Sequence, residues 1–144
     1  MEESGALSVF PAATIILQTK EGEKLQVMAL IDSGATISAM PKNIAPLLGI
    51  DLKKGKKRKI LGIGTKHIIG WQHDVTIQLG NNKVNLPIAF LDDNTTPRIL
   101  GRMGIFENFT ILFKEDKQQS AFVSVTGKEN NAINTILDVI KTSE

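Results

Sequence analysis

One acidic residue directly follows an apolar run in the first quarter of the chain. The run is Ala29-Leu30-Ile31, and Asp32-Ser33-Gly34-Ala35 comes immediately after it. Asp is a poor strand residue and is costly to bury alone, so its side chain belongs at a strand end. The Ser33 hydroxyl can donate or accept a hydrogen bond, and Gly34 lets another backbone come close. A carboxylate in that setting is suited to holding a water molecule.

Hydrolysis of an amide by acid–base chemistry needs two carboxylates. One takes a proton from water while the other delivers a proton, and two carboxyl groups that share one proton meet both needs. The chain has a single Asp-Ser-Gly, because Asp92-Asp93-Asn94 lacks the glycine and falls in a predicted turn. A twofold dimer would supply the second carboxylate by placing Asp32 against its symmetry mate.

The elements that must position Asp32 are mostly strands. Residues 12–19 and 25–31 are apolar and β-branched on either side of a polar turn, which predicts a hairpin. Residues 75–79 and 84–90 flank Gly80-Asn81-Asn82 and predict a second hairpin. Short strands are also expected at 109–113 and 121–125. Closely spaced strands with polar turns indicate a closed or partly closed all-β fold.

Two helical signals interrupt this pattern. Residues 43–48 predict a short helical turn after Pro41. Near the C-terminus Ile133, Ile136, Leu137 and Ile140 share one face of an α-helix, and the spacing of Thr126 and Glu129 matches a capping box before it. We expect this helix to pack on the β body, with contact to a second subunit or partner as the alternative.

Two further motifs follow Asp32 in order. Residues 61–70 read Leu-Gly-Ile-Gly-Thr-Lys-His-Ile-Ile-Gly, a glycine-bearing hairpin able to open and close over a cleft. Residues 99–102 read Ile-Leu-Gly-Arg. With these three motifs, the chain resembles the retropepsin-like aspartic proteases, the single-domain dimeric relatives of pepsin. More closely, it looks like the soluble retropepsin-like proteins of cellular organisms. The resemblance covers about residues 12–113.

The resemblance implies a role for each matched position. Asp32 of each subunit contributes to the catalytic dyad, and Ser33, Gly34 and Ala35 complete the active-site loop. The substrate-binding residues of the flap are Gly62, Ile63, Gly64, Thr65 and Lys66. The structural signature behind the loop is Ile99, Leu100, Gly101 and Arg102.

This chain departs from some viral members at one position. Those members carry an acid two residues after the glycine, which pairs with the arginine of the signature. Thr36 stands there in this sequence, so Arg102 must find another partner.

These observations predict an all-β fold, half of an acid-protease closed barrel, with a short helix after the Ile-Leu-Gly-Arg signature and a C-terminal helix. We expect one domain over residues 1–144, with a core at about 12–113 and an extension at about 114–144. The expected function is that of an aspartic endopeptidase that works as a homodimer on peptide or protein substrates. The alternative is a catalytically weak or inactive dimerisation or peptide-binding module of the same fold.

Composition sets limits on other chemistry. The chain of 144 residues has no cysteine, which excludes disulfide scaffolds, thiolate zinc sites and cysteine nucleophiles. His67 and His73 have no firm third ligand and are expected to be exposed, so we predict no metal and no cofactor. Ser33 has no histidine in a defined relation to it, which argues against a serine nucleophile.

Charge and hydropathy complete the expectations. Residues 53–59 carry six cations and predict a solvated loop before the flap; a preference for acidic substrates and a nucleic-acid surface are the alternatives. With a net charge of only +2, we expect no nucleic-acid partner. No apolar run approaches the roughly 20 residues of a membrane span. Because Met1–Ser4 lacks a positive signal-peptide start, we expect a cytoplasmic protein.

Overall fold

The computed structural model describes residues 11–61 and 66–139 of the chain. Nine strands account for most of the regular structure, in agreement with the predicted all-β class. They are β1 (Ala12–Gln18), β2 (Lys24–Ile31), β3 (Ser38–Pro41), β4 (Lys56–Leu61), β5 (His67–Leu79), β6 (Asn82–Leu91), β7 (Ile99–Leu100), β8 (Phe109–Lys114) and β9 (Gln119–Ser124). The helical segments are η1 (Lys42–Leu48), η2 (Leu52–Lys54), η3 (Glu115–Lys117) and α1 (Asn130–Val139).

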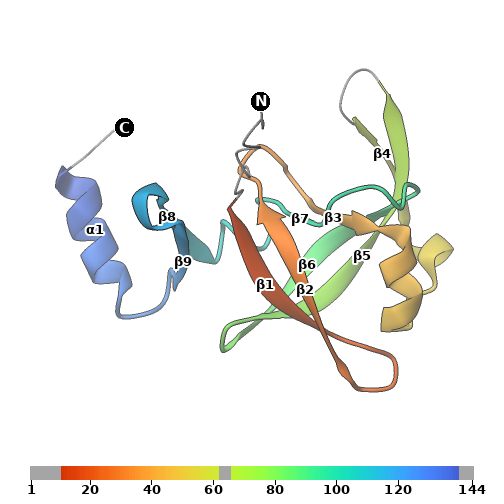
Figure 1. Ribbon diagram of the computed structural model, residues 1–144, viewed down its shortest axis with the longest axis horizontal. Coiled ribbons are helices and arrows are strands. Elements are labelled where there is room, and N and C mark those ends of the chain that lie inside the picture. The colour runs from red at the N-terminus through yellow and green to blue at the C-terminus, as the bar shows by residue number, and fades with distance from the viewer. Residues whose placement is uncertain (1–10, 62–65, 140–144) are drawn as a thin grey trace, which may run out of the picture.

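Seven of these strands form one sheet that closes on itself. Their order is β1-β2-β7-β3-β6-β5-β4, and a further pairing of β1 with β5, Ile16 opposite Gln78, joins the two sides. β4 therefore lies outside the closed ring as an edge strand that pairs with β5. Both predicted hairpins are present, β1–β2 and β5–β6, each in antiparallel register. The sheet is the closed barrel half that the sequence predicted (Figure 1).

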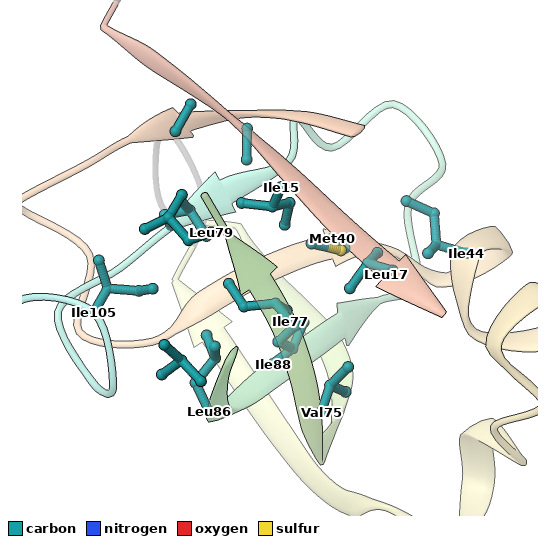
Figure 2. Packing of buried hydrophobic residues seen from close by; sticks show 14 of the residues in the cluster. Ile15, Leu17, Met40, Ile44, Val75, Ile77, Leu79, Leu86, Ile88 and Ile105 are labelled. Carbon is teal, nitrogen blue, oxygen red and sulfur yellow. The ribbon is translucent and has the colours of Figure 1, made fainter. Parts of the chain in front are cut away.

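The interior of the barrel is filled by alternate residues of these strands. Every second side chain is buried along β1, along residues 75–79 of β5 and along residues 84–88 of β6, as the period of two of a half-buried strand requires. Figure 2 shows these side chains converging from several strands on one centre. The fully buried members with the largest side chains are Phe90, Ile15, Leu17, Met40, Ile77, Leu86, Ile88, Leu100 and Ile105.

The β2–β3 connection carries Asp32, and β7 lies between these two strands. β7 runs parallel to β2, with Ile31 opposite Leu100, and antiparallel to β3, with Ala39 opposite Ile99. The topology thus brings residues 69 positions apart in sequence to one end of the barrel. In Figure 1 the Asp32 connection and the β4–β5 hairpin extend toward the same side of the molecule.

One of the two short helical segments predicted within the barrel region is present, and the other is not a regular helix. η1 begins after Pro41, as expected, and ends at Leu48; the next residue, Gly49, has a φ of 73°, which suits glycine. The short helix expected after the Ile-Leu-Gly-Arg signature is not a regular helix. Residues 102–108 form consecutive hydrogen-bonded turns, because Gly104 at φ 79° interrupts the helical path.

The C-terminal segment forms a layer of its own beside the barrel. β8 and β9 pair as a separate two-stranded sheet, and α1 lies next to them at the end of the molecule away from β4 (Figure 1). The helix begins at Asn130, four residues after Thr126, so the predicted capping box does not cap it. Ile133 is buried, whereas Ile136 and Leu137 are 52% and 55% exposed. Two of the three described residues of the predicted apolar face therefore lie at the surface, and Ile140 lies outside the described residues.

Among the described residues, none of the helices has both the length and the apolar character that a bilayer crossing requires.

Candidate active site

Asp32 is the first residue after β2, at the end of a strand buried in the barrel wall. Its backbone N–H donates to the carbonyl oxygen of Leu100 at 3.0 Å, which continues the parallel pairing of β2 with β7 by one residue. Its side chain is half-buried. The strand end therefore fixes the backbone of Asp32 while its carboxylate stays within reach of solvent.

The loop after Asp32 folds back on the carboxylate. The Gly34 N–H donates to Asp32 Oδ1 at 2.9 Å, and the Ala35 N–H donates to the Asp32 carbonyl oxygen at 3.3 Å. Ser33 and Gly34 are exposed on this turn. A Cβ built on Gly34 would lie 3.2 Å from Asp32 Oδ1, closer than most Cβ contacts. The glycine thus allows the tight turn that orients the carboxylate.

The segment after β7 supports the loop from behind through backbone hydrogen bonds. The Arg102 N–H donates to the Ala35 carbonyl oxygen at 2.8 Å, and the Met103 N–H donates to that of Thr36 at 2.9 Å. The Arg102 side chain is exposed. Arg102 therefore holds the loop of its own chain through its N–H, and this contact needs no acid at position 36.

Gly101 and Ser38 form the buried part of this support. Gly101 is buried, and a Cβ there would lie 2.6 Å from the carbonyl carbon and oxygen of Ile37. Its N–H donates to Ser38 Oγ at 3.0 Å, and Ser38 is fully buried. Ser38 was not among the residues predicted from the sequence, although a lone serine in the apolar stretch 37–41 is a signal for a buried hydrogen bond.

The predicted flap corresponds to the hairpin of β4 and β5. The strands pair in antiparallel register from Lys56 opposite Gln72 to Leu61 opposite His67. The predicted substrate-binding positions Gly62, Ile63, Gly64 and Thr65 lie outside the described residues, and Lys66 is exposed. Residues 56–59, expected in a loop, form most of β4, because the antiparallel ladder with β5 extends beyond the glycine-bearing motif.

A small apolar cluster connects this hairpin to the Asp32 loop. Its buried members come from β3 and β6, and partly buried isoleucines from the loop and from both hairpin strands pack on them. The members are Ala39, Ala89, Leu91, Ile37, Ile60 and Ile68. The cluster is separate from the barrel core and adjoins the segment that carries Asp32.

The family model described as "gag-polyprotein putative aspartyl protease" matches residues 18–105 of this chain. The match includes the Asp32 loop, the β4–β5 hairpin and the Ile99–Arg102 signature, and it covers more than half of the chain. The chain belongs to this aspartyl protease family. The resemblance seen in the sequence is thereby confirmed.

Two further comparisons accompany the family match. The solved structure of EIAV protease complexed with the inhibitor HBY-793 is 21% identical to this chain, and the alignment covers 67% of this chain and 86% of that chain with a TM-score of 0.49. No curated protein matches the chain.

The acidic residues Asp92 and Asp93 have contacts elsewhere in the fold. Asp92 forms an ion pair with Lys42. Asp93 Oδ1 accepts hydrogen bonds from the Thr95 hydroxyl at 2.6 Å and from the Thr95 N–H at 2.9 Å. The hydroxyl first, and then the backbone N–H, lower the pKa of Asp93 below its ordinary value. Both carboxylates thus have structural roles in the loop after β6.

The two histidines also have separate places in the fold. His67 is exposed, as expected. The expectation for His73 was wrong: it is half-buried, because its Nε2 hydrogen-bonds to the Leu52 carbonyl oxygen at 2.8 Å and its ring packs edge-on against Phe90. His73 thus helps to anchor η2 to β5. Within residues 11–61 and 66–139, no cluster of three potential metal ligands occurs.

Proposed function

We propose that this family member is an aspartic endopeptidase whose active centre contains Asp32 from each of two identical subunits. One observation carries the proposal: the Asp32 carboxylate, held by the Gly34 N–H, stands half-buried at a strand end. The backbone around it is bound on one side to Leu100 and on the other to Arg102 and Met103. This rigid support suits a catalytic group, which must be held in one orientation.

The second carboxylate comes from the second copy of the chain. A twofold axis beside the Asp32 loop would bring the two carboxyl groups together, and at about 3 Å they would share one proton. In the same arrangement the exposed Ser33 hydroxyl would hydrogen-bond across the axis. The homodimer is thus a requirement of the chemistry, because a single subunit would lack the acid or the base.

The reaction then proceeds without a covalent enzyme intermediate. The ionised Asp32 takes a proton from the bound water as the water oxygen attacks the scissile carbonyl carbon, and the protonated Asp32 donates to the carbonyl oxygen. The product of this step is a tetrahedral gem-diol. Transfer of a proton to the amide nitrogen and cleavage of the C–N bond then release an amine and a carboxylic acid.

The substrate would lie extended between the two subunits. Exposed backbone at Gly34 would pair with the peptide main chain, and the β4–β5 hairpin would cover it as a flap. The substrate-binding residues predicted for the flap are Gly62, Ile63, Gly64, Thr65 and Lys66. The Ile37–Ile60–Ile68 cluster would give apolar contacts nearby. A cytoplasmic location and a single domain over residues 1–144 stay predictions from the sequence.

Cleavage of a diverse peptide library tests this function. The wild-type protein and the variants Asp32→Asn and Asp74→Asn are assayed from acidic to neutral pH; Asp74 is an exposed residue of β5 and serves as the matched control. We expect wild type and Asp74→Asn to cut the same bonds, and Asp32→Asn to be slower by about a hundredfold or more. A dimeric wild-type protein that cuts nothing would favour the peptide-binding module instead.

A further inference from the structure

Positive charge is concentrated in the segment that forms the β4–β5 hairpin. Residues 52–73 contain seven of the 17 Lys and Arg residues and none of the 15 Asp and Glu residues. The rest of the chain consequently has an excess of acidic residues. In an otherwise weakly charged protein this separation creates a local positive field at one element.

The cations of β4 are not used in ion pairs within the described part of the chain. Lys56, Lys57, Arg58 and Lys59 are all exposed. The nearby ion pair, Lys54 with Asp51 at 3.6 Å, belongs to η2. Lysines on an edge strand have a general use, since they prevent other strands from pairing with it. That use does not depend on which face of the strand a cation occupies, whereas recognition of a substrate does.

The two faces of β4 are distinguished by the contacts of Ile60. Ile60 lies opposite Ile68 in register, and both pack on the cluster that contains Ile37 of the Asp32 connection. Because side chains alternate along a strand, Lys56 and Arg58 share the face of Ile60, whereas Lys57 and Lys59 point to the other side. We call these the Ile60 face and the Lys57 face of β4.

Arg58 is oriented along the Ile60 face by a neighbour on β5. Its Nε donates to Gln72 Oε1 at 2.9 Å. This bond uses the inner nitrogen of the guanidinium. Within the described residues the two terminal nitrogens form no hydrogen bond, so they can bind a carboxylate through two parallel hydrogen bonds. Gly70 lies opposite Arg58 in register and has no side chain to cover it.

We infer that the substrates of this site carry an acidic residue that Arg58 and Lys56 bind on the Ile60 face. This inference rests on the proposed peptidase function and adds its substrate class. Two residues of a strand span about 7 Å, the same as two residues of an extended peptide. An acidic residue bound by Arg58 would therefore lie about two positions farther from the scissile bond than a side chain in contact with Ile60.

Matched peptides and matched variants test the inference. Peptides cut by the wild-type protein are compared as Glu and Gln versions at each flanking position. The variant K56Q/R58Q removes two charges from the Ile60 face, and K57Q/K59Q removes two charges from the other face of the same strand. We expect the wild type to prefer the Glu peptide by about three- to tenfold in kcat/KM, less at high salt. K56Q/R58Q should lose that preference, and K57Q/K59Q should retain most of it.

Each other result has a defined meaning. Equal cleavage of Glu and Gln peptides by the wild type overturns the inference and leaves the peptidase intact. Equal loss of preference in both double variants also overturns it, because only a diffuse field would be acting.

Binding of the same peptides to Asp32→Asn, measured by fluorescence anisotropy, separates recognition from cleavage. If the wild type cuts no peptide, library peptides that bind to it are compared as Glu and Gln versions instead. A Glu preference in that binding keeps the recognition of acidic peptides and overturns the peptidase function. Tighter binding of a single-stranded DNA oligonucleotide than of either peptide, lost equally in both double variants, points to nucleic acid and overturns it.

Discussion

Ser38 Oγ accepts a hydrogen bond from the backbone N–H of Gly101 at 3.0 Å, inside the barrel wall behind the Asp32 loop. Ser38 begins β3 and Gly101 directly follows β7, so this bond links the two strands where they diverge. Both residues are buried. The bond satisfies a polar hydrogen that the paired strands leave unused.

Replacement of Ser38 by alanine should therefore destabilise the protein. The Ser38→Ala variant leaves the Gly101 N–H buried without an acceptor, which costs about 1–3 kcal/mol in the free energy of unfolding. Urea denaturation measures this change, and Ser120→Ala, an exposed serine on β9, is the control with an expected change below about 0.5 kcal/mol. Equal free energies of unfolding for the two variants would show that the hydrogen bond does not stabilise the fold.

Alanine at Gly101 should lower the stability of the protein, whereas alanine at Gly34 should lower its activity. Gly101→Ala places its Cβ against the Ile37 backbone at 2.6 Å, so we expect a loss of about 3 kcal/mol in unfolding free energy. Gly34→Ala meets only Asp32 Oδ1, at 3.2 Å, and should keep the fold but displace the carboxylate and lower kcat. Denaturation and peptide cleavage, measured on both variants, check this. A stable, fully active Gly101→Ala protein would contradict it.

The loop at Asp93 should contribute a pH-dependent stability. Since hydrogen bonds from Thr95 lower the pKa of Asp93 in the folded state, its ionised form stabilises the fold above the unfolded pKa. This contribution is lost as the pH falls through the folded pKa. Thr95→Val removes the hydroxyl donor, so we expect the pKa of Asp93 to rise toward its ordinary value, as read by an NMR titration.

The stability of the same variant gives an independent check. The difference in unfolding free energy between the wild type and Thr95→Val should be largest near neutral pH and vanish in strong acid. Thr76→Val, at an exposed position of β5, is the control. A difference that grows as the pH falls would have the wrong sign for this account.

The parts of the site that the sequence predicted are those built from local patterns. Asp32 at a strand end followed from the apolar run before it, and the barrel strands followed from alternation. The residues 99–102 followed from the resemblance, whereas the backbone hydrogen bonds that join Arg102 and Met103 to the Asp32 loop are visible only in the structure. Arg102 acts through its N–H, a group that every residue except proline possesses, so its side chain gave no clue.

The predictions from the sequence were wrong or incomplete where segments distant in the chain decide the local structure. The composition of the lysine-rich residues 56–59 predicted a loop, but their antiparallel pairing with β5 makes them a strand. His73 was predicted to be exposed, but η2 brings the Leu52 carbonyl oxygen to its ring, and the side chain is half-buried. The role of Ser38 was not predicted, because its hydrogen-bond donor is Gly101, 63 residues later in the chain. Pairing across such distances is set by topology, which a single sequence does not display.

The central claim, that two copies of Asp32 share one active centre, is tested most directly by mixing. Wild-type protein is combined with an equal amount of Asp32→Asn protein, left until the subunits have exchanged, and assayed for peptide cleavage. An aliquot assayed before exchange is the control, and ultracentrifugation verifies that both proteins are dimeric. Mixed dimers hold only one Asp32, so we expect the activity to fall to about half of that of the wild type alone, and further with more variant. Activity that stays constant at every ratio would show that each subunit works alone and would contradict the shared dyad.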